Sequence, residues 1–359
     1  MLRLLSLGGV LLVILDGVRT LRDLTRLMRF VAAGAALLGV LALLQNLTGQ
    51  TLLDFWGSIP GITLGDGGVV ERGGRTRAAA TALHPLEFGT VLNGALPLCV
   101  AAALSGGFRG GRSWRTALMW WAASVLLALM ALMSVSRSAI VGLAVAVALT
   151  IPMVPVKYRT WVILSGCVVV AGLIAVVPGL AGTTFGLFAS SDGSTLSRTG
   201  ALARLPEFVS ASPLVGIGFG LFLPRYYIFD NGWAGLAIEL GLLGVAAFAL
   251  LIASAVWSAW RAANVDTRSE LRLSGRALAA SVITAAVVLS FFDGLSFAMS
   301  AGFLFVMIGL CAASRTVASA DATWIDRGPT SAVEFGDNED KDAMNYVSRP
   351  AITDFRRRH

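Results

Sequence analysis

The sequence predicts an all-α protein, a polytopic transmembrane helical bundle of about nine helices with a large extracytoplasmic loop between helices six and seven. The first indication is composition, because 56% of the 359 residues are hydrophobic and only 14% are charged, against about 25% charged residues in soluble domains. The second is the repetition of apolar blocks whose lengths are close to the roughly 20 residues that a helix needs to cross a bilayer. The third is that blocks such as 139–154 and 235–256 are apolar on every face, which favours helices over alternating strands.

Nine apolar blocks give the predicted helices in order. They lie at about 1–15, 30–47, 86–104, 117–135, 138–156, 161–178, 232–256, 277–292 and 297–313. The first block has the apolar core of a signal peptide, but no small-residue cleavage site follows it, so we expect it to be retained. Two connections are long, at about 48–85 and 179–231, and we expect the functional residues in these outer loops. Residues 1–313 therefore form one transmembrane domain.

The orientation follows from the distribution of Lys and Arg, which are concentrated in cytoplasmic loops of membrane proteins. If 16–29 is cytoplasmic, then 105–116, 157–160, 258–276 and the tail from Ser314 lie on the same side, and together they hold 20 of the 28 basic residues. The tail, 314–359, mixes acidic and basic side chains and has few large apolar residues. We therefore expect a disordered cytoplasmic extension.

Several kinds of chemistry find no support in the sequence. The net charge of +7 reflects basic cytoplasmic loops, so nucleic acid is not an expected partner. Cys99, Cys167 and Cys311 lie far apart inside apolar blocks, where cysteine behaves as a small hydrophobic residue. The two histidines, His84 and His359, are too few for a Cys/His zinc site. We expect no metal and no cofactor.

Seven arginines fall on the predicted outer side, where the orientation bias should deplete them. They are Arg72, Arg75, Arg77, Arg137, Arg198, Arg204 and Arg225. The planar guanidinium suits phosphate oxygens, so these residues indicate an anionic ligand, unless they pair with nearby carboxylates or lie in water. Arg137 stands in Ser-Arg-Ser between two apolar blocks, which is typical of a functional residue or of an arginine that snorkels from a helix end.

After Ser-Arg-Ser, a second informative stretch leads into the predicted seventh helix. Asp230 and Asn231 directly precede this apolar helix and are either catalytic groups or N-terminal caps. Glu239 lies a little over two turns further on, and a carboxylate at such a position needs a partner. The glycines of the preceding Gly-Ile-Gly-Phe-Gly run, 216–220, do not form a dinucleotide fingerprint, because no strand–helix unit flanks them.

The third stretch, Arg77–Phe88, leads into the third helix. Pro85 suits the first turn of a helix. His84 and Glu87 could form an acid–base pair, or they could be a cap and a structural contact.

Together these stretches resemble the O-antigen ligase and Wzy-type polysaccharide polymerase superfamily of bacterial inner-membrane proteins. The resemblance rests on R-A-x(5)-H-P-x-E-F at 77–88, S-R-S at 136–138, R-x(14)-P-L-x-G-x-G-x-G at 198–220, and D-N followed by E-L-G-x-x-G at 239–244. It covers about residues 31 to 313. It implies a multi-pass protein of the bacterial cytoplasmic membrane.

The resemblance implies glycosyl transfer at the outer face, from a polyprenyl diphosphate to an acceptor hydroxyl, without a nucleotide sugar or a required metal. Its expected partners are the lipid-linked glycan, membrane lipid, the glycan acceptor and other polysaccharide assembly proteins. Arg137 and Arg198 match the positions that bind the diphosphate. Arg204, Arg225, Arg77 and Glu239 are further substrate-binding candidates.

The base is an open question, because ligases of this family usually carry His-Asn where this chain has Asp230-Asn231. Asp230 could accept the proton, His84 could do so from another helix, or the chain could be a polymerase with different acceptor chemistry. Two alternatives stand beside a polymerase or ligase: a transporter for an anionic solute, and a non-catalytic scaffold of a glycan assembly complex.

Overall fold

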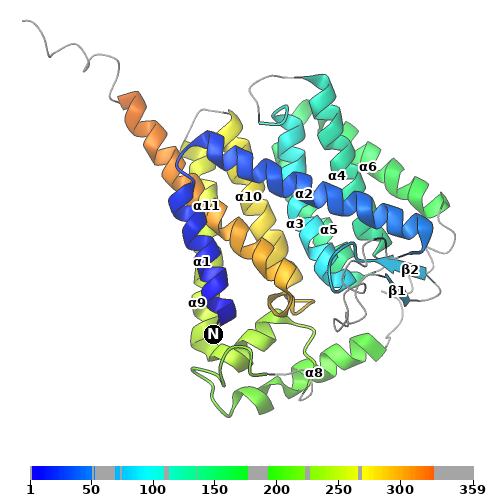
Figure 1. Cartoon of the computed structure of the whole chain (residues 1–359), viewed down its shortest axis with the longest axis vertical. Helices are drawn as coiled ribbons and strands as arrows, with labels where there is room; N and C mark the ends of the chain where they lie inside the picture. Colours follow the sequence, from blue (N-terminus) through cyan, green and yellow to red (C-terminus); the bar gives the residue numbers. More distant parts are fainter. Residues whose placement is uncertain are drawn as a thin grey trace, which may run out of the picture. The chain divides into compact units, whose positions relative to one another are not determined.

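A computed structural model describes residues 2–50, 52, 69–72, 75–108, 113–134, 136–176, 193–222, 227–265 and 269–326 (Figure 1). The chain forms two compact units, 1–319 and 320–359, and all that follows concerns the first. The helices are α1 (Leu2–Gly17), α2 (Leu21–Thr48), α3 (Pro85–Leu104), α4 (Trp114–Met133), α5 (Arg137–Thr150), α6 (Val156–Val176), α8 (Gly193–Val209), α9 (Gly232–Val265), α10 (Ser269–Val288) and α11 (Ala298–Asp326). Single 3₁₀ turns, η1 (Ile151–Met153) and η2 (Gly294–Ser296), follow α5 and precede α11.

The predicted helical membrane bundle is confirmed. Each of the nine expected helices is present, and within the described residues six helices are long and apolar enough to cross a membrane: α2, α3, α4, α9, α10 and α11. The long connection between the sixth and seventh predicted helices contains α8, which we did not predict because its residues are mostly polar or small.

Two further differences concern the loops and the tail. The loop expected at 48–85 contains an antiparallel hairpin, β1 (Val69–Arg72) and β2 (Arg75–Ala78). Residues 314–326, which we assigned to the tail, continue α11, while 327–359 lie outside the described residues.

Local sequence signals explain where key helices begin and end. Thr20 and Asp23 form a reciprocal capping box at the start of α2, and Gly49 ends that helix in the left-handed conformation. Gln45, in the last turn of α2, exchanges hydrogen bonds with the backbone of Ala80 at 2.9 and 3.1 Å. This pair ties the end of α2 to the segment that leads into α3.

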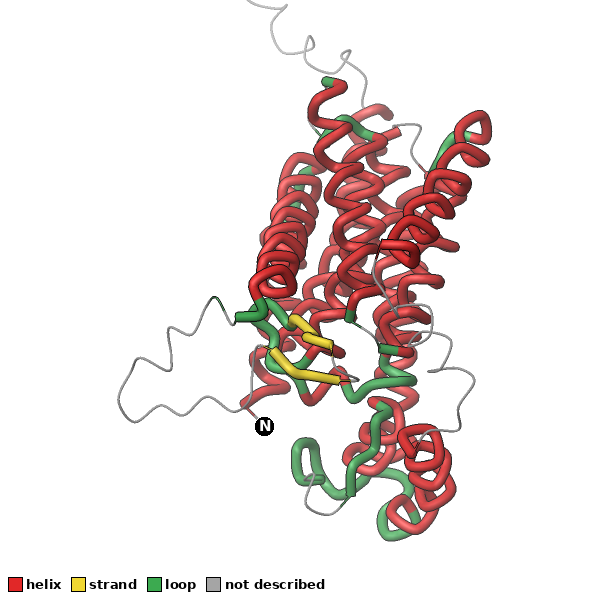
Figure 2. The backbone as a smooth tube through the Cα atoms, turned by 90° about the vertical axis from the view of Figure 1, so that its right-hand side faces the viewer, coloured by secondary structure: helices red, strands yellow, loops and turns green. Residues whose placement is uncertain are grey.

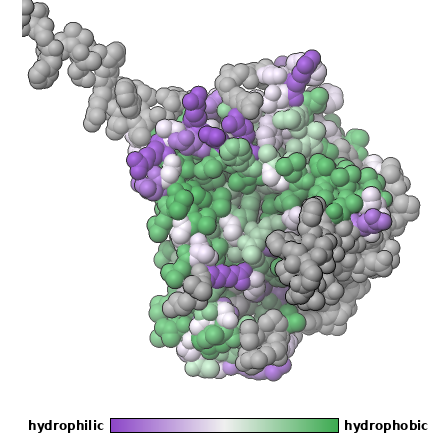
Figure 3. All heavy atoms as spheres, in the orientation of Figure 1, coloured by the Kyte–Doolittle hydropathy of each residue, from purple (hydrophilic) through white to green (hydrophobic). Residues whose placement is uncertain are grey.

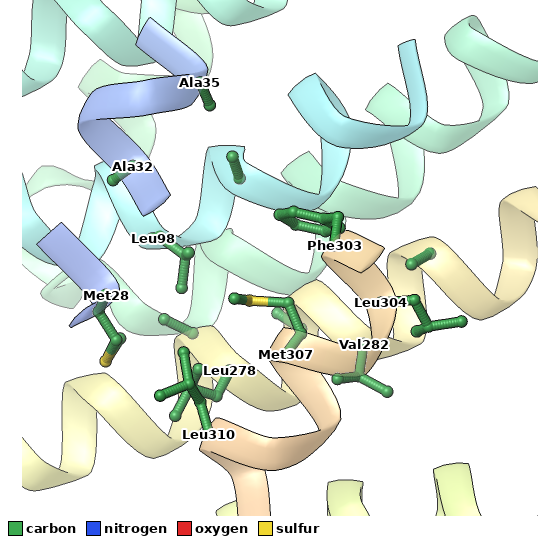
Figure 4. Close-up of a cluster of buried hydrophobic side chains, with 14 of the residues drawn as sticks. Met28, Ala32, Ala35, Leu98, Leu278, Val282, Phe303, Leu304, Met307 and Leu310 are labelled. Atoms are coloured by element: carbon green, nitrogen blue, oxygen red, sulfur yellow. The ribbon is translucent and has the colours of Figure 1, made fainter. Parts of the chain in front are cut away.

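The core lies between α3 and α10, with α2 and α11 packed against them (Figure 4). Small residues allow close approach: a Cβ on Gly94 would lie 2.4 Å from the Phe303 ring. Almost all of α3 is buried, including the polar Asn93, whose Nδ2 donates to the Ala139 carbonyl at 2.8 Å. The side chains drawn in Figure 4 come from all four helices: Met28, Ala32, Ala35, Leu98, Leu278, Val282, Phe303, Leu304, Met307 and Leu310.

Large apolar side chains also cover the outside of the bundle, where they would face lipid. Examples are Leu37, Leu118 and Leu250, which are 70%, 59% and 70% exposed. Figure 3 shows broad hydrophobic surfaces, with hydrophilic residues gathered where α1 turns into α2. Such a surface suits hydrocarbon and not water.

The hairpin, α8 and the loop that follows α8 lie at one end of the bundle (Figure 2). The first residues of α3, α9 and α11 lie at this end as well. It is therefore here that polar side chains from distant parts of the sequence can meet.

Candidate functional site

A cavity of about 660 Å³ opens at this end of the bundle. This volume falls within the range of about 300–1,000 Å³ typical of small-molecule sites. Its walls come from the first turns of α3 and α9, the loop after α8, the turn between α10 and α11, and α1. Its lining includes His84 and four residues of charged type, Arg3, Asp230, Glu239 and Asp293.

His84 caps α3 and presents its ring to the cavity. Its Nδ1 accepts a hydrogen bond from the Leu86 amide at 3.2 Å, and the ring packs against Phe292 and Phe297 with centroids 6.5 and 6.0 Å apart. Because Nδ1 is an acceptor here, the neutral ring carries its proton on Nε2. His84 is thus arranged to donate a hydrogen bond rather than to accept a proton.

Glu87 does not form the acid–base pair with His84 that the sequence allowed. The Glu87 side chain is buried, and its Oε1 accepts from the Met299 and Ser300 amides at 2.7 and 3.4 Å. Its Oε2 accepts from the Leu83 amide at 3.0 Å. Glu87 therefore binds the start of α11 to the start of α3, a structural role.

Asp230 and Asn231, adjacent in sequence, face different surroundings. The Oδ1 atom of Asn231 accepts from the amides of Trp233 and Ala234 at 3.0 and 3.1 Å, which caps α9. Its Nδ2 donates to the Ser290 carbonyl at 3.0 Å, which joins the start of α9 to the turn after α10. Asp230 lines the cavity and is half-buried. Of the two, Asp230 has the position of a catalytic group.

Helix α9 is broken at Gly241, whose φ and ψ of 67° and −172° are not helical. The segment Pro213–Gly218, which we name the strap, fills this break. Four backbone hydrogen bonds join them: Ile217 N to Ile238 O, Gly218 N to Glu239 O, Leu242 N to Pro213 O and Leu243 N to Leu214 O, at 3.1, 2.8, 2.9 and 3.2 Å. Backbone groups freed by the break are thus satisfied by protein, as an apolar environment demands.

The strap needs glycine on both sides of the contact. A Cβ on Gly216 would lie 2.3 Å from the carbonyl carbon of Glu239, and one on Gly241 would lie 2.3 Å from the Leu214 oxygen. Both glycines also have a positive φ, 68° and 67°, that other residues rarely adopt. The P-L-x-G-x-G and E-L-G motifs are therefore two halves of one contact.

This contact positions Glu239, which lies two residues before Gly241 and whose carbonyl accepts from the Gly218 amide. Its Oε1 accepts a hydrogen bond from the Phe222 amide at 3.3 Å, and the side chain lines the cavity. The partner that the sequence required is thus a backbone N–H group in the loop after α8.

Asp293 and Arg3 are cavity residues that the sequence reasoning missed. Asp293 lies between α10 and η2 and accepts a hydrogen bond from the Ser296 hydroxyl. Burial raises the pKa of Asp293, while the hydrogen bonds from Ser296 and the charge of Arg3 act in the opposite direction. A charged residue in a short connection between apolar blocks was the available signal, the same one that singled out Arg137.

Arg204 and Arg137 are the two predicted arginines whose side chains the structure describes, and neither lines the cavity. Arg204, in α8, is exposed and pairs with Glu207 at 3.2 Å, and its guanidinium lies 5.2 Å from the ring centre of Tyr227, a cavity residue. Arg137 is the half-buried first residue of α5 and does not line the cavity as the described residues define it.

The remaining arginines are placed by their backbones alone. Arg198 lies in α8, six residues before Arg204, and Arg77 pairs with Val70 in the hairpin. The side chains of these two arginines, and Arg225 as a whole, lie outside the described residues.

Comparison with known families identifies the segment that holds most of these features. Residues 122–249 match the family described as O-antigen ligase. The match starts within α4 and ends within α9, so it includes Arg137, Arg198, the strap, Asp230 and Glu239. No curated protein matches the chain. Residues 122–249 are thus similar to an O-antigen ligase domain, and the resemblance of the chain to the O-antigen ligase and Wzy-type polymerase superfamily is confirmed over this segment.

Proposed function

We propose that the chain is a membrane glycosyltransferase that transfers glycan from a polyprenyl diphosphate to an acceptor at the outer face of the cytoplasmic membrane. The transfer would polymerise or ligate a surface polysaccharide or exopolysaccharide. The observation that carries this proposal is the position of Asp230: an acidic residue of the O-antigen ligase domain lines a cavity at one end of a membrane helix bundle.

The arrangement of charges supports an outward-facing cavity. Basic residues mark the helix ends opposite the cavity, as with Arg22 and Arg26 at the start of α2 and Arg272 and Arg276 at the start of α10. Since such residues are concentrated on the cytoplasmic side, the cavity would face outward. The same alternation puts the end of α11 and the C-terminus in the cytoplasm.

Asp230 is the proposed base. The acceptor hydroxyl attacks the anomeric carbon and gives its proton to the Asp230 carboxylate, while the bond from that carbon to the diphosphate oxygen breaks. The bonding electrons leave with the diphosphate. His84, with its proton on Nε2, would donate a hydrogen bond to the substrate and orient it.

The diphosphate would bind beside the cavity rather than inside it. Three carboxylates and one guanidinium line the cavity, and such a surplus of negative charge repels a diphosphate. Positive charge lies nearby on α8, where Arg204 contacts the cavity residue Tyr227. Arg198, Arg225, Arg77 and Arg137 are the further arginines we assign to the diphosphate, and their charge would stabilise it as a leaving group without a metal ion.

The alternative function is a transporter for an anionic solute. The break in α9 is typical of transporters, because many of them bind ions at broken helices. In such sites the freed N–H groups face the solute. Here the Leu242 and Leu243 amides donate to carbonyls of the strap instead. The break is thus occupied by protein, which favours the glycosyltransferase.

The test measures lipid-linked and released glycan in a strain from which the gene is deleted. The same strain carrying wild type, Asp230→Asn, Arg198→Ala or Arg198→Lys at equal membrane abundance is measured beside it. We expect the first two variants to match the deletion and the lysine variant to recover in part, because lysine keeps the charge but loses the planar fork. Accumulated single repeat units would identify a polymerase, and long unligated chains a ligase. Unchanged glycan in all samples would refute the proposal.

A further inference from the structure

The cavity has an aromatic wall with a defined geometry. Phe292 and Phe297 lie with ring centroids 4.8 Å apart and flank His84. Phe222, Tyr227 and Phe229 form a second cluster in the lining, in which the ring centroids of Tyr227 and Phe229 are 5.0 Å apart. Aromatic faces of this kind pack against the C–H face of a pyranose ring, since both surfaces are flat and apolar.

Three carboxylates are prominent among the polar groups of the cavity. Asp230, Glu239 and Asp293 line it, and an ionised carboxylate only accepts hydrogen bonds. Their natural partners are hydroxyl and ammonium groups. Arg3 supplies a donor, because its Nη2 atom is buried and has no hydrogen-bond partner within the described part of the chain. A sugar hydroxyl can satisfy both kinds of group at once.

The carboxylates are held in place by the fold. Glu239 is fixed by the strap and by its bond from the Phe222 amide, and Asp293 by its bond from Ser296. Fixed carboxylates cannot turn away from a ligand that carries negative charge. Like charges in contact are strongly unfavourable, so this site discriminates by charge.

We propose that the cavity binds a sugar of the transferred or accepting glycan and selects neutral or amino sugars against uronic acids. This assignment rests on the proposed function and adds the class of sugar to it. The aromatic walls bind the ring, the three carboxylates accept from hydroxyl or ammonium groups, and a uronate is rejected by the same carboxylates.

The test uses the purified full chain in phosphatidylcholine nanodiscs and three tetrasaccharides of similar length. Chitotetraose is neutral, chitosan tetraose is cationic and tetragalacturonate is anionic. Binding is measured at pH 7 by calorimetry or saturation-transfer NMR. We expect the first two to bind at least about tenfold more tightly than the third, a ratio equivalent to about 1.4 kcal/mol. The expectation opposes the net charge of +7, which would attract tetragalacturonate non-specifically.

Variants separate local charge from folding. The double variant Glu239→Gln, Asp293→Asn keeps the shape of both side chains and removes two charges, so we expect it to bind tetragalacturonate more tightly than wild type does. A misfolded protein would not gain binding. The control Asp16→Asn removes an exposed charge in α1, outside the cavity lining, and should leave the wild-type ratio unchanged.

Two results would overturn the assignment: tetragalacturonate bound as tightly as chitotetraose by wild type, or no gain in the double variant. Either result with glycan transfer intact in cells would leave the proposed function standing. Conversely, the expected preference without glycan transfer would support the sugar site and refute the glycosyltransferase.

Discussion

Alanine at Gly241 should separate the broken helix from its strap. The added Cβ would lie 2.3 Å from the Leu214 oxygen, a backbone atom that cannot move without shifting the strap. The φ of 67° and ψ of −172° also lie in a region essentially restricted to glycine, where another residue costs about 1–3 kcal/mol. Loss of the four strap hydrogen bonds would add about 4 kcal/mol at about 1 kcal/mol each.

Gly241→Ala should therefore destabilise the chain by about 5–7 kcal/mol. At about 2 °C per kcal/mol for a chain of this size, the midpoint of thermal unfolding should fall by about 10–14 °C. Gly216→Ala should act similarly, because its Cβ would lie 2.3 Å from the Glu239 carbonyl carbon on the other side of the same contact. The assay is thermal unfolding of the purified protein in detergent at one fixed heating rate, followed by tryptophan fluorescence.

Two glycines provide matched controls. Gly220 has a φ of +75°, but a Cβ there would meet no atom within 4 Å. Gly220→Ala thus carries the backbone strain alone, about 1–2 kcal/mol. Gly34, inside α2, has neither a positive φ nor a neighbour within 4 Å, and alanine there should be neutral or stabilising. If Gly241→Ala lowered the midpoint no more than Gly220→Ala, the strap would not be what fills the break.

Three further predictions concern individual side chains. Glu87→Ala should lower stability by about 2–4 kcal/mol, because it leaves the half-buried Met299 amide and the buried Ser300 amide without their acceptor. Glu87→Gln should lose less, and equal losses in denaturant unfolding would contradict the capping role. Asn231→Ala should cost about 1–2 kcal/mol through loss of the cap of α9, while the folded fraction still transfers glycan; abolished transfer at normal abundance would make Asn231 catalytic. Because burial raises the pKa of Asp293, the native state binds more protons than the unfolded state above the ordinary aspartate pKa, and this group lowers stability as pH rises. The midpoint of Asp293→Asn relative to wild type should therefore be higher at pH 8 than at pH 5, and an equal difference at both would refute this.

The helices could be predicted from the sequence because membrane spans are a one-dimensional signal. Apolar blocks of sufficient length gave all nine, with differences at their ends. Helix α8 was missed because it is polar and lies in a loop. The break at Gly241 was missed because glycine within an apolar block is equally typical of close helix packing, the role we first assigned to it.

The candidate site was predictable in part. Asp230 and His84 stood out because each directly precedes an apolar helix, a position that exposes a side chain at the end of a bundle. The sequence could not show that Asn231, beside Asp230, and Glu87, near His84, have structural roles. A polar side chain at the start of a helix can equally be a catalytic group. Only the structure shows that their polar atoms are engaged by helix starts. Arg3 was missed because Glu239 and Asp293, the carboxylates on which its charge acts in the cavity, lie more than 200 residues away in sequence.

The most direct test of the glycosyltransferase is the reaction itself. Purified chain in proteoliposomes is supplied with a polyprenyl-diphosphate-linked glycan and a glycan acceptor, and free polyprenyl diphosphate is measured by mass spectrometry. We predict release that requires the acceptor, is accompanied by an equal amount of extended acceptor, and is abolished in Asp230→Asn but retained in folded Asn231→Ser. Release undiminished by Asp230→Asn would contradict the role of Asp230, and no release under conditions where the vesicles take up an anionic solute would contradict the glycosyltransferase.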